Sequence, residues 1–431
     1  DELWGVTKTG GDTLGNIYKF NTDGSGFGNV HQFEFLSGDR YNVNMIDYGG
    51  LTLAGGKMYG LTSLGGNHGF GTLFSYDTVT GVQTKIIDFD NNEFAPGKYP
   101  SGNLLLAPNG LLYGVATGGG YYGLGVLFSF DPVTNAYTKL FDFAGAGGGT
   151  GPQGGLCIGP GGRLYGLCGL GGIYNKGTIF YWDYTNLTFQ RIFNFNDTTS
   201  GSAPIGPLVM ALNGMLYGNT EGFNQFDQKG GYFMFNVGTG TLTTIHDFDL
   251  DGPTFADGAS PQTGLTLASD GMLYGTTGHS IIRINPTGNV YSKIFDYNTN
   301  VSGQGKFEEG ANGLLYAVGP GLSAGIIYVF NYNTMALTEL YNLAAATGQY
   351  NTGKLLKTSN SKFWGLTRRG GANDDGVLFS FLLPGTYTDL YDFQNWSEGK
   401  EPLAGIIKAT NGNVYGTTSK GGQFGRGTIF K

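Results

Sequence analysis

Short hydrophobic segments alternate with glycine-rich turns along this chain, and the segments recur in groups of four. One group predicts four β-strands, here called A to D, over residues 104–107, 111–116, 126–130 and 137–143. Tight turns join A to B and C to D, and a glycine-rich B–C loop covers residues 118–125. Three short reversals followed by a longer return are typical of a four-stranded antiparallel meander.

An aromatic residue followed by a small residue marks strand B of each group. Nine copies occur, 42 to 57 residues apart, and their aromatic residues are Trp4, Tyr59, Tyr113, Tyr165, Tyr217, Tyr274, Tyr316, Trp364 and Tyr415. Meanders repeated every ~40–50 residues are typical of a β-propeller, in which each repeat forms one blade. The sequence therefore predicts an all-β propeller of nine four-stranded antiparallel repeats, in a single domain over residues 1–431.

The number of blades is not fixed by the repeats. The first repeat lacks strand A and the ninth lacks strand D, so the expected strands are too many for eight four-stranded blades and too few for nine. Either the protein continues beyond Lys431 or two blades have three strands. Nine blades are favoured and eight are possible. A β-solenoid fits less well, because its coils are shorter and lack three tight reversals.

A Gly-x-x-Pro pattern recurs in the longer segment between strands D and A. It occurs over residues 97–100, 201–204, 258–261 and 399–402. Because proline lacks an N–H group, we expect these segments to cross between blades without pairing.

The composition excludes several classes of protein. Glycine accounts for 80 of the 431 residues, while charged residues make up 13% and aromatic residues 14%. A disordered chain has few aromatic residues and more charge. The net charge of −8 is spread without a basic stripe, which argues against a nucleic-acid partner. No apolar run is long enough to span a membrane as a helix. The chain begins at Asp1 without a signal peptide, as a processed exported protein would.

The repeats resemble the GloVer tandem-repeat family of bacterial proteins. The residues that carry the resemblance are 412–422 and 427–431, and other repeats match more loosely, as 59–74 do. Repeats six and seven depart from the pattern, since residues 275–282 lose most of the B–C loop and Ala317 replaces the glycine. The resemblance implies an exported protein, outside the cell or on its outer surface. It also implies a C-terminal sorting or anchor region, including that of type IX secretion, which is not present in this chain. It implies no reaction.

Strand D ends in an acidic or amide residue between two aromatic residues in many repeats. The aspartates at this position are Asp88, Asp142, Asp247, Asp296 and Asp392. A residue that recurs in this way indicates a structural role, such as capping the loop that follows.

One of these segments has the spacing of a calcium loop. Asp247, Asp249 and Asp251 alternate and are followed by Gly252, and such oxygen ligands suit Ca²⁺. The bidentate Glu of an EF-hand would fall at Gly258, so the full motif fails. The alternative is a solvated acidic loop.

Nucleophile and transition-metal motifs are missing from the sequence. The four histidines, His31, His68, His246 and His279, lack metal-ligand spacing, and no G-x-S-x-G segment occurs. Cys157 is expected opposite Tyr165, with Cys168 on the other face of the hairpin, so a disulfide is not expected.

Aromatic residues on the B–C loops are candidate contacts for sugars. They are Phe70, Tyr121, Tyr122, Tyr174, Phe223, Phe226 and Phe424. Sugars stack on aromatic faces through their C–H groups. The alternative is that these rings fold back and cover the edge of the hairpin.

Three functions follow from this sequence. The first is a non-enzymatic, exported scaffold or protein-interaction platform, whose partner is a cell-surface protein or the export machinery. The second is a glycan-binding, lectin-like propeller, with calcium as its possible cofactor. The third is a polysaccharide lyase or hydrolase. Its site would lie at the propeller axis. Repeats five to seven are the most irregular, and their unusual polar residues, which form no constellation in the sequence, are Glu221, Asp227, His279 and Arg283.

Overall fold

Antiparallel β-sheets make up the computed structural model of the protein. The structure describes residues 2–6, 16–21, 28–32, 51–63, 66–77, 80, 82–90, 96–196, 200–222, 230–248, 261, 264–277, 280–296, 306–310, 312–319, 325–351, 355–357, 362–393, 400–402, 406–408, 414–420 and 429–430. The chain divides into two compact units. The central unit is Asp90–Gly303, and the terminal unit combines Asp1–Phe89 with Gln304–Lys431. The prediction of a single domain stays a prediction.

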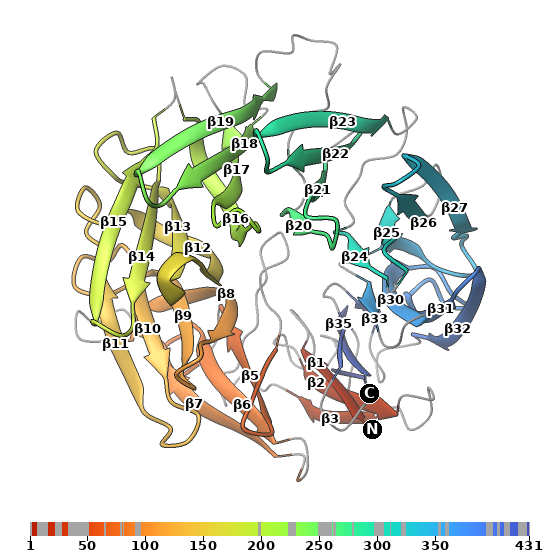
Figure 1. Ribbon diagram of the computed structural model, residues 1–431. Coiled ribbons are helices and arrows are strands. Elements are labelled where there is room, and N and C mark those ends of the chain that lie inside the picture. Colours follow the sequence, from red (N-terminus) through yellow and green to blue (C-terminus); the bar gives the residue numbers. More distant parts are fainter. Residues whose placement is uncertain are drawn as a thin grey trace. The chain divides into compact units, whose positions relative to one another are not determined.

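The central unit contains four sheets of four strands among its described residues (Figure 1). The first two sheets are β8 (Lys98–Leu106), β9 (Leu112–Gly118), β10 (Val126–Phe130) and β11 (Tyr137–Asp142), then β12 (Thr150–Ile158), β13 (Leu164–Leu170), β14 (Thr178–Asp183) and β15 (Thr188–Asn194). The next two are β16 (Ser202–Met210), β17 (Leu216–Gly222), β18 (Gly231–Asn236) and β19 (Thr241–Asp247), then β20 (Thr266–Leu267), β21 (Leu273–Thr276), β22 (Ser280–Asn285) and β23 (Val290–Asp296). A 3₁₀ turn, η1 (Pro160–Gly162), joins β12 to β13. Each sheet is a meander in chain order, as predicted.

The terminal unit contains the remaining described sheets. Two have four strands: β4 (Thr52–Ala54), β5 (Lys57–Thr62), β6 (Thr72–Asp77) and β7 (Gln83–Asp88), and β24 (Glu308–Glu309), β25 (Leu315–Gly319), β26 (Ile326–Asn331) and β27 (Ala336–Asn342). The third has five: β28 (Gln349–Asn351), β29 (Leu356–Lys357), β30 (Lys362–Arg369), β31 (Val377–Leu382) and β32 (Thr386–Asp392). The last has seven: β1 (Glu2–Val6), β2 (Asn16–Asn21), β3 (Gly28–Gln32), β33 (Lys400–Pro402), β34 (Ile407–Lys408), β35 (Val414–Lys420) and β36 (Ile429–Phe430).

The first and ninth repeats share this last sheet. Strand β1 pairs with β35, with Leu3 opposite Val414. The described strands of the nine repeats therefore form eight sheets and not nine separate ones. Pairing between the two ends satisfies the backbone groups of β1, which has no strand A of its own in sequence.

The expectation that proline keeps the D-to-A segment out of the sheet is wrong. Strand β8 begins at Lys98 and continues through Pro100, which lies opposite Ala116. Strand β8 is the edge strand of its sheet. Proline is tolerated there, because its missing N–H can face away from the neighbouring strand.

The aromatic–glycine marker has a packing explanation. A Cβ atom on Gly114 would lie 2.5 Å from the Cζ atom of Phe128, which sits opposite it on β10. Glycine on strand B therefore makes room for a phenylalanine ring on strand C. In the seventh repeat Ala317 replaces the glycine, and its partner is Tyr328 in place of phenylalanine.

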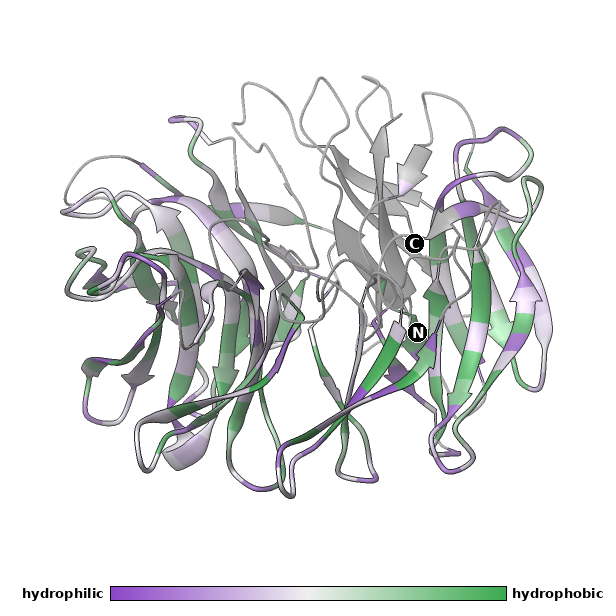
Figure 2. Ribbon diagram, turned by 90° about the horizontal axis from the view of Figure 1, so that it is seen from above, coloured by the Kyte–Doolittle hydropathy of each residue, from purple (hydrophilic) through white to green (hydrophobic). Residues whose placement is uncertain are grey.

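Strands B and C form the core, because each is covered on both faces. All five residues of β10 are buried, while strand β11 is half-buried. Figure 2 shows hydrophobic residues concentrated within strands and hydrophilic ones near the turns. Neighbouring sheets of the central unit pack through aromatic rings. The rings of Phe141 and Phe189 stack with centroids 3.5 Å apart.

Glycine also allows successive A strands of the central unit to approach each other. A Cβ atom on Gly102 in β8 would lie 2.6 Å from the main-chain nitrogen of Gly155 in β12. Glycine therefore occurs where these strands crowd together.

Candidate functional site

The B–C loop between β9 and β10 is a tight glycine turn. Gly119, Gly120 and Gly123 all have positive φ angles, between 73° and 76°. A Cβ atom on Gly120 would overlap Oδ1 of Asp142. Glycine is therefore required at this position both by the backbone conformation and by the close approach of a side chain.

The acidic or amide residue at the end of strand D holds this loop. Oδ1 of Asp142 accepts a hydrogen bond from the main-chain N–H of Tyr121, at 2.9 Å. The same bond joins Asp88 to Asn67 at 2.8 Å and Asn194 to Ile173 at 3.0 Å. The structural role predicted for this position is confirmed in these three sheets. The loop that it caps precedes strand D in the chain and does not follow it.

Because their backbone is fastened in this way, two B–C loops present large side chains to solvent. Tyr121 and Tyr122 are 61% and 56% exposed, and their rings meet edge to face at 4.9 Å. In the next sheet Ile173 and Tyr174 occupy the equivalent positions and are 65% and 56% exposed. These rings do not fold back over the hairpin.

The other predicted loop aromatics differ. Phe70 is half-buried. Phe223, Phe226 and Phe424 lie outside the described residues.

A cavity of about 400 Å³ lies beside Tyr174. We call it the Tyr174 cavity, and it is lined by Ile173, Tyr174, Ile192, Phe193, Asn194, Asn196, Ser200 and Leu242. Its apolar side comes from β15 and from Leu242 on β19. On its polar side, the hydroxyl oxygen of Ser200 accepts a bond from the N–H of Asn196 at 2.8 Å. An aromatic face beside amide groups suits a ligand that has both C–H and hydroxyl groups.

The charge beside the B–C loops changes from sheet to sheet. Three aspartates at the end of strand D, Asp88, Asp142 and Asp296, form ion pairs with lysines three residues earlier, at 2.9 to 3.0 Å. In the sheet β12–β15, whose B–C loop carries Tyr174, the residue that caps this loop is the neutral Asn194. The residue in the lysine position is Arg191, which donates to the carbonyl of Ala146. Asn194 also lines the Tyr174 cavity, so the capping residue adds no charge to the cavity wall.

In the five-stranded sheet, the position three residues before the aspartate at the end of strand D is Asp389 and not a lysine. Partial burial raises the pKa of Asp389 to about 6, and the neighbouring Asp392 carboxylate contributes to the rise. Oδ1 of Asp392 is buried and accepts no hydrogen bond within the described part of the chain.

The predicted calcium ligands are only partly covered by the structure. Asp247 is the last residue of β19 and lies opposite Gly231. Asp249 and Asp251 lie outside the described residues. Among the residues that are described, no three His, Cys, Asp or Glu side chains are grouped to hold a metal ion. Calcium binding stays a prediction.

The residues named for a lyase or hydrolase site are also partly covered. Glu221 is exposed near the end of β17, and Arg283 lies within β22. Asp227 and His279 are outside the described residues.

Both cysteines are free, as predicted. Cys157 lies opposite Tyr165. Burial raises the pKa of the Cys157 thiol to about 12, and it also raises the pKa of Cys168. Neither thiol is activated as a nucleophile.

Sequence reasoning found the loop aromatics but missed the Tyr174 cavity. The cavity needs Leu242 from the next sheet, and no local pattern in the sequence signals that contact.

Comparison with solved structures shows the fold alone. A puromycin hydrolase structure is 13% identical with a TM-score of 0.51, over 85% of this chain and 57% of that chain. A streptogramin B lyase structure is 16% identical with a TM-score of 0.44, over 90% of this chain and 95% of that one. An oligogalacturonate lyase from Vibrio parahaemolyticus is 14% identical with a TM-score of 0.48, over 83% and 95%. The structural neighbours are β-propeller-like.

A comparison with curated proteins finds no match. In the described residues, no helix has the length and apolar character needed to cross a membrane. The Gloeobacter/Verrucomicrobia repeat matches residues 91–283 and 278–431, which together cover most of the chain. The protein therefore belongs to the Gloeobacter/Verrucomicrobia repeat family, the family that its repeats resemble.

Proposed function

We propose that this protein is an exported, non-enzymatic β-propeller that binds extracellular glycans through its B–C loops. The observation that carries the proposal is the exposure of Tyr121, Tyr122 and Tyr174 on loops whose backbone is held by Asp142 and Asn194. A loop whose backbone is already held loses less conformational entropy on binding than a loose loop does.

The Tyr174 cavity supports a sugar as the ligand. Its volume of about 400 Å³ falls within the usual range of small-molecule sites. Asn194 and Asn196 supply amide groups at its wall. A pyranose ring could stack on Tyr174 while its hydroxyl groups bond with these amides.

The main alternative is a scaffold that binds a cell-surface protein or the export machinery. The exposed side chains of Ile173 and Leu170 beside the same loop favour a protein partner. An aliphatic side chain offers a sugar neither a flat ring face nor a hydrogen bond. Tyrosine is also enriched at protein interfaces.

The eight described sheets, with the first and ninth repeats in one of them, support eight blades over nine. Membership of the repeat family supports a place outside the cell or on its outer surface. Calcium at Asp247, Asp249 and Asp251 would assist the same function. A lyase or hydrolase that uses a cysteine nucleophile is disfavoured, because burial raises the pKa of both thiols.

The test is a glycan array probed with the purified chain, in Ca²⁺ and again in EDTA. We expect a defined sugar to bind, and Tyr174→Ser to remove that binding. Val133→Ser is the matched control, because Val133 is 86% exposed on a C–D turn away from the B–C loops. Loss of binding in EDTA would support the calcium site. A blank array would reject the glycan proposal and leave the protein platform.

A further inference from the structure

The A–B turn of the fourth repeat departs from its neighbours. In three other repeats an asparagine of this turn donates to the hydroxyl of the marker tyrosine, at 2.8 to 3.0 Å. These pairs are Asn109 with Tyr113, Asn213 with Tyr217, and Asn312 with Tyr316. In the fourth repeat Gly161 takes the asparagine position, and the hydroxyl of Tyr165 donates to the carbonyl of Pro160 at 3.0 Å.

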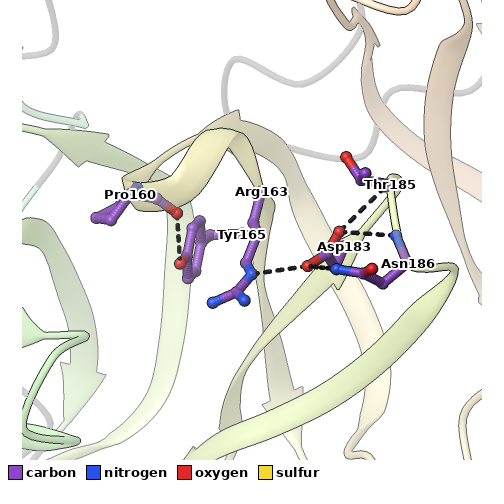
Figure 3. A network of polar contacts seen from close by, with 6 residues as sticks. All are labelled: Pro160, Arg163, Tyr165, Asp183, Thr185 and Asn186. Atoms are coloured by element: carbon purple, nitrogen blue, oxygen red, sulfur yellow. Dashed lines mark hydrogen bonds and ion pairs between the residues drawn. The ribbon is translucent and has the colours of Figure 1, made fainter.

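The same turn carries an arginine where the neighbouring repeats have leucine or methionine. Arg163 aligns with Leu111 and Met215. Its Nε atom donates to Oδ2 of Asp183 at 3.0 Å (Figure 3). Its guanidinium lies 4.5 Å from the ring centroid of Tyr181. The terminal nitrogens of the guanidinium lie on the side of Tyr165.

Asp183 is built to hold this arginine. Its carboxylate also accepts bonds from the main-chain N–H groups of Thr185 and Asn186 and from the side-chain amide of Asn186, each at 3.0 Å. The bonds from Asn186 are the largest cause that lowers the pKa of Asp183, to about 2. The carboxylate therefore remains charged and holds the Nε–H of the guanidinium. The Tyr165 side chain also interacts with Arg163, and the two terminal nitrogens carry four N–H groups between them, so donors remain for a ligand.

A cavity of about 410 Å³ opens beside the arginine. We call it the Arg163 cavity, and it is lined by Pro160, Gly161, Arg163, Gly214, Met215, Asn236, Val237 and Gly238. Arg163 is the one charged residue among these eight. The oxygen of Asn236 is occupied by the N–H groups of Gly238 and Thr239, at 2.9 and 3.2 Å. The side chain of Asn236 can then offer the cavity only its amide donors.

We propose that the Arg163 cavity binds a carboxylate side chain of an acidic peptide. An oriented guanidinium beside an amide donor matches the acceptor atoms of a carboxylate, and charge-assisted bonds of this kind are strong. The remaining walls are the aliphatic Pro160, Met215 and Val237, which suit the methylene groups of a peptide. No aromatic ring lines this cavity, so it lacks the flat platform that favours a sugar.

This site is independent of the proposed glycan function. It is built from A–B and C–D turns, whereas the exposed tyrosines lie on B–C loops. Tyr174→Ser should therefore leave it unchanged, and failure of either proposal leaves the other standing.

The experiment measures fluorescence polarisation of a labelled peptide of alternating glutamate and glycine, added to the full chain. The matching peptide with glutamine, and trigalacturonate as an unlabelled competitor, form the other arms. We expect the glutamate peptide to bind at least about tenfold more tightly than the glutamine peptide. Arg163→Met, which installs the residue of the next repeat, should reduce binding by about tenfold or more.

Two further variants make the result specific. Gly161→Asn restores the side chain of the sibling turns, should fill the cavity, and should weaken binding while Arg163 is retained. Lys139→Met removes an equal charge and an equivalent ion pair with Asp142, outside the cavity, and should bind as the wild type does. Circular dichroism checks that each variant is folded. Equal binding by the wild type and Arg163→Met would overturn the proposal, as would absence of binding by the glutamate peptide. Displacement of the bound glutamate peptide by trigalacturonate at a lower concentration than by the unlabelled glutamate peptide would also overturn it, in favour of a sugar acid.

Discussion

Oδ1 of Asp142 accepts a hydrogen bond from the main-chain N–H of Tyr121, 21 residues earlier in the chain, at 2.9 Å. This bond ties the end of strand D to the B–C loop of the same sheet. It places an exposed tyrosine on a fixed backbone, and Asn194 repeats the arrangement in the next sheet with Ile173.

The first prediction concerns this bond. Asp142→Ala should destabilise the protein by about 1–2 kcal/mol, because the N–H of Tyr121 loses a charged partner. Asp142→Asn keeps an acceptor oxygen, as Asn194 does, and should cost less than about 1 kcal/mol. Urea unfolding measures both values, and hydrogen exchange at Tyr121 should accelerate in the alanine variant only. Equal effects of the two substitutions would contradict the role of the bond.

The second prediction concerns a glycine between neighbouring sheets. Gly125 has a φ of 116°, and a Cβ atom there would lie 2.5 Å from Cδ of Pro152. Gly125→Ala should therefore cost about 2–4 kcal/mol, from backbone strain and from overpacking together. Gly110, with a φ of 83° and open space around it, is the control. Its alanine variant should cost about 1 kcal/mol. Comparable midpoints for the two variants in a urea titration would argue against a close contact at Pro152.

The third prediction concerns pH. The pKa of Asp389 is raised to about 6 by partial burial and by Asp392, while an unfolded aspartate titrates near 4. Between these values the folded protein holds a proton that the unfolded chain has released. Stability should therefore fall as the pH rises from about 4 to 6.

Asp389→Lys should remove this loss and restore the ion pair seen between Lys85 and Asp88. We expect a gain of about 0.5–1 kcal/mol at pH 7, since such exposed pairs contribute little. The gain should be smaller at pH 4.5, where Asp389 is already protonated. Urea unfolding at both pH values measures the difference, and an identical pH profile for wild type and variant would count against the carboxylate pair.

The fourth prediction concerns the cysteines. Burial raises the pKa of the Cys157 thiol to about 12 and raises that of Cys168 as well. At pH 8 both should react with iodoacetamide at least about a hundredfold more slowly than free cysteine. Full reactivity should return in urea. Fast modification of the folded protein, followed by mass spectrometry, would show that one thiol is accessible and ionised.

Strands that are buried on both faces could be predicted from the sequence, because such strands appear as continuous apolar runs. Residues 126–130 were predicted as strand C, and β10 has the same bounds. Strand A was predicted as 104–107, whereas β8 begins at Lys98. A local pattern cannot tell an edge strand, which tolerates Pro100, from a central strand, which does not.

The site was only half readable. The exposed tyrosines stood out as aromatic residues on glycine-rich loops. Arg163 could not be recognised from the sequence, because its proposed role depends on Asp183, 20 residues away, and on a cavity wall from the next repeat.

The sequence by itself determined the repeated meander, the strand order within each four-stranded sheet and the position of the glycine loops. These features follow from local alternation of apolar residues, glycine and turn residues. Tertiary structure alone decided that Leu3 lies opposite Val414 on paired strands, that Tyr174 faces solvent, and that Arg163 borders a cavity. The reason is physical: each depends on backbone and side chains brought together from distant parts of the chain, and no local pattern records that contact.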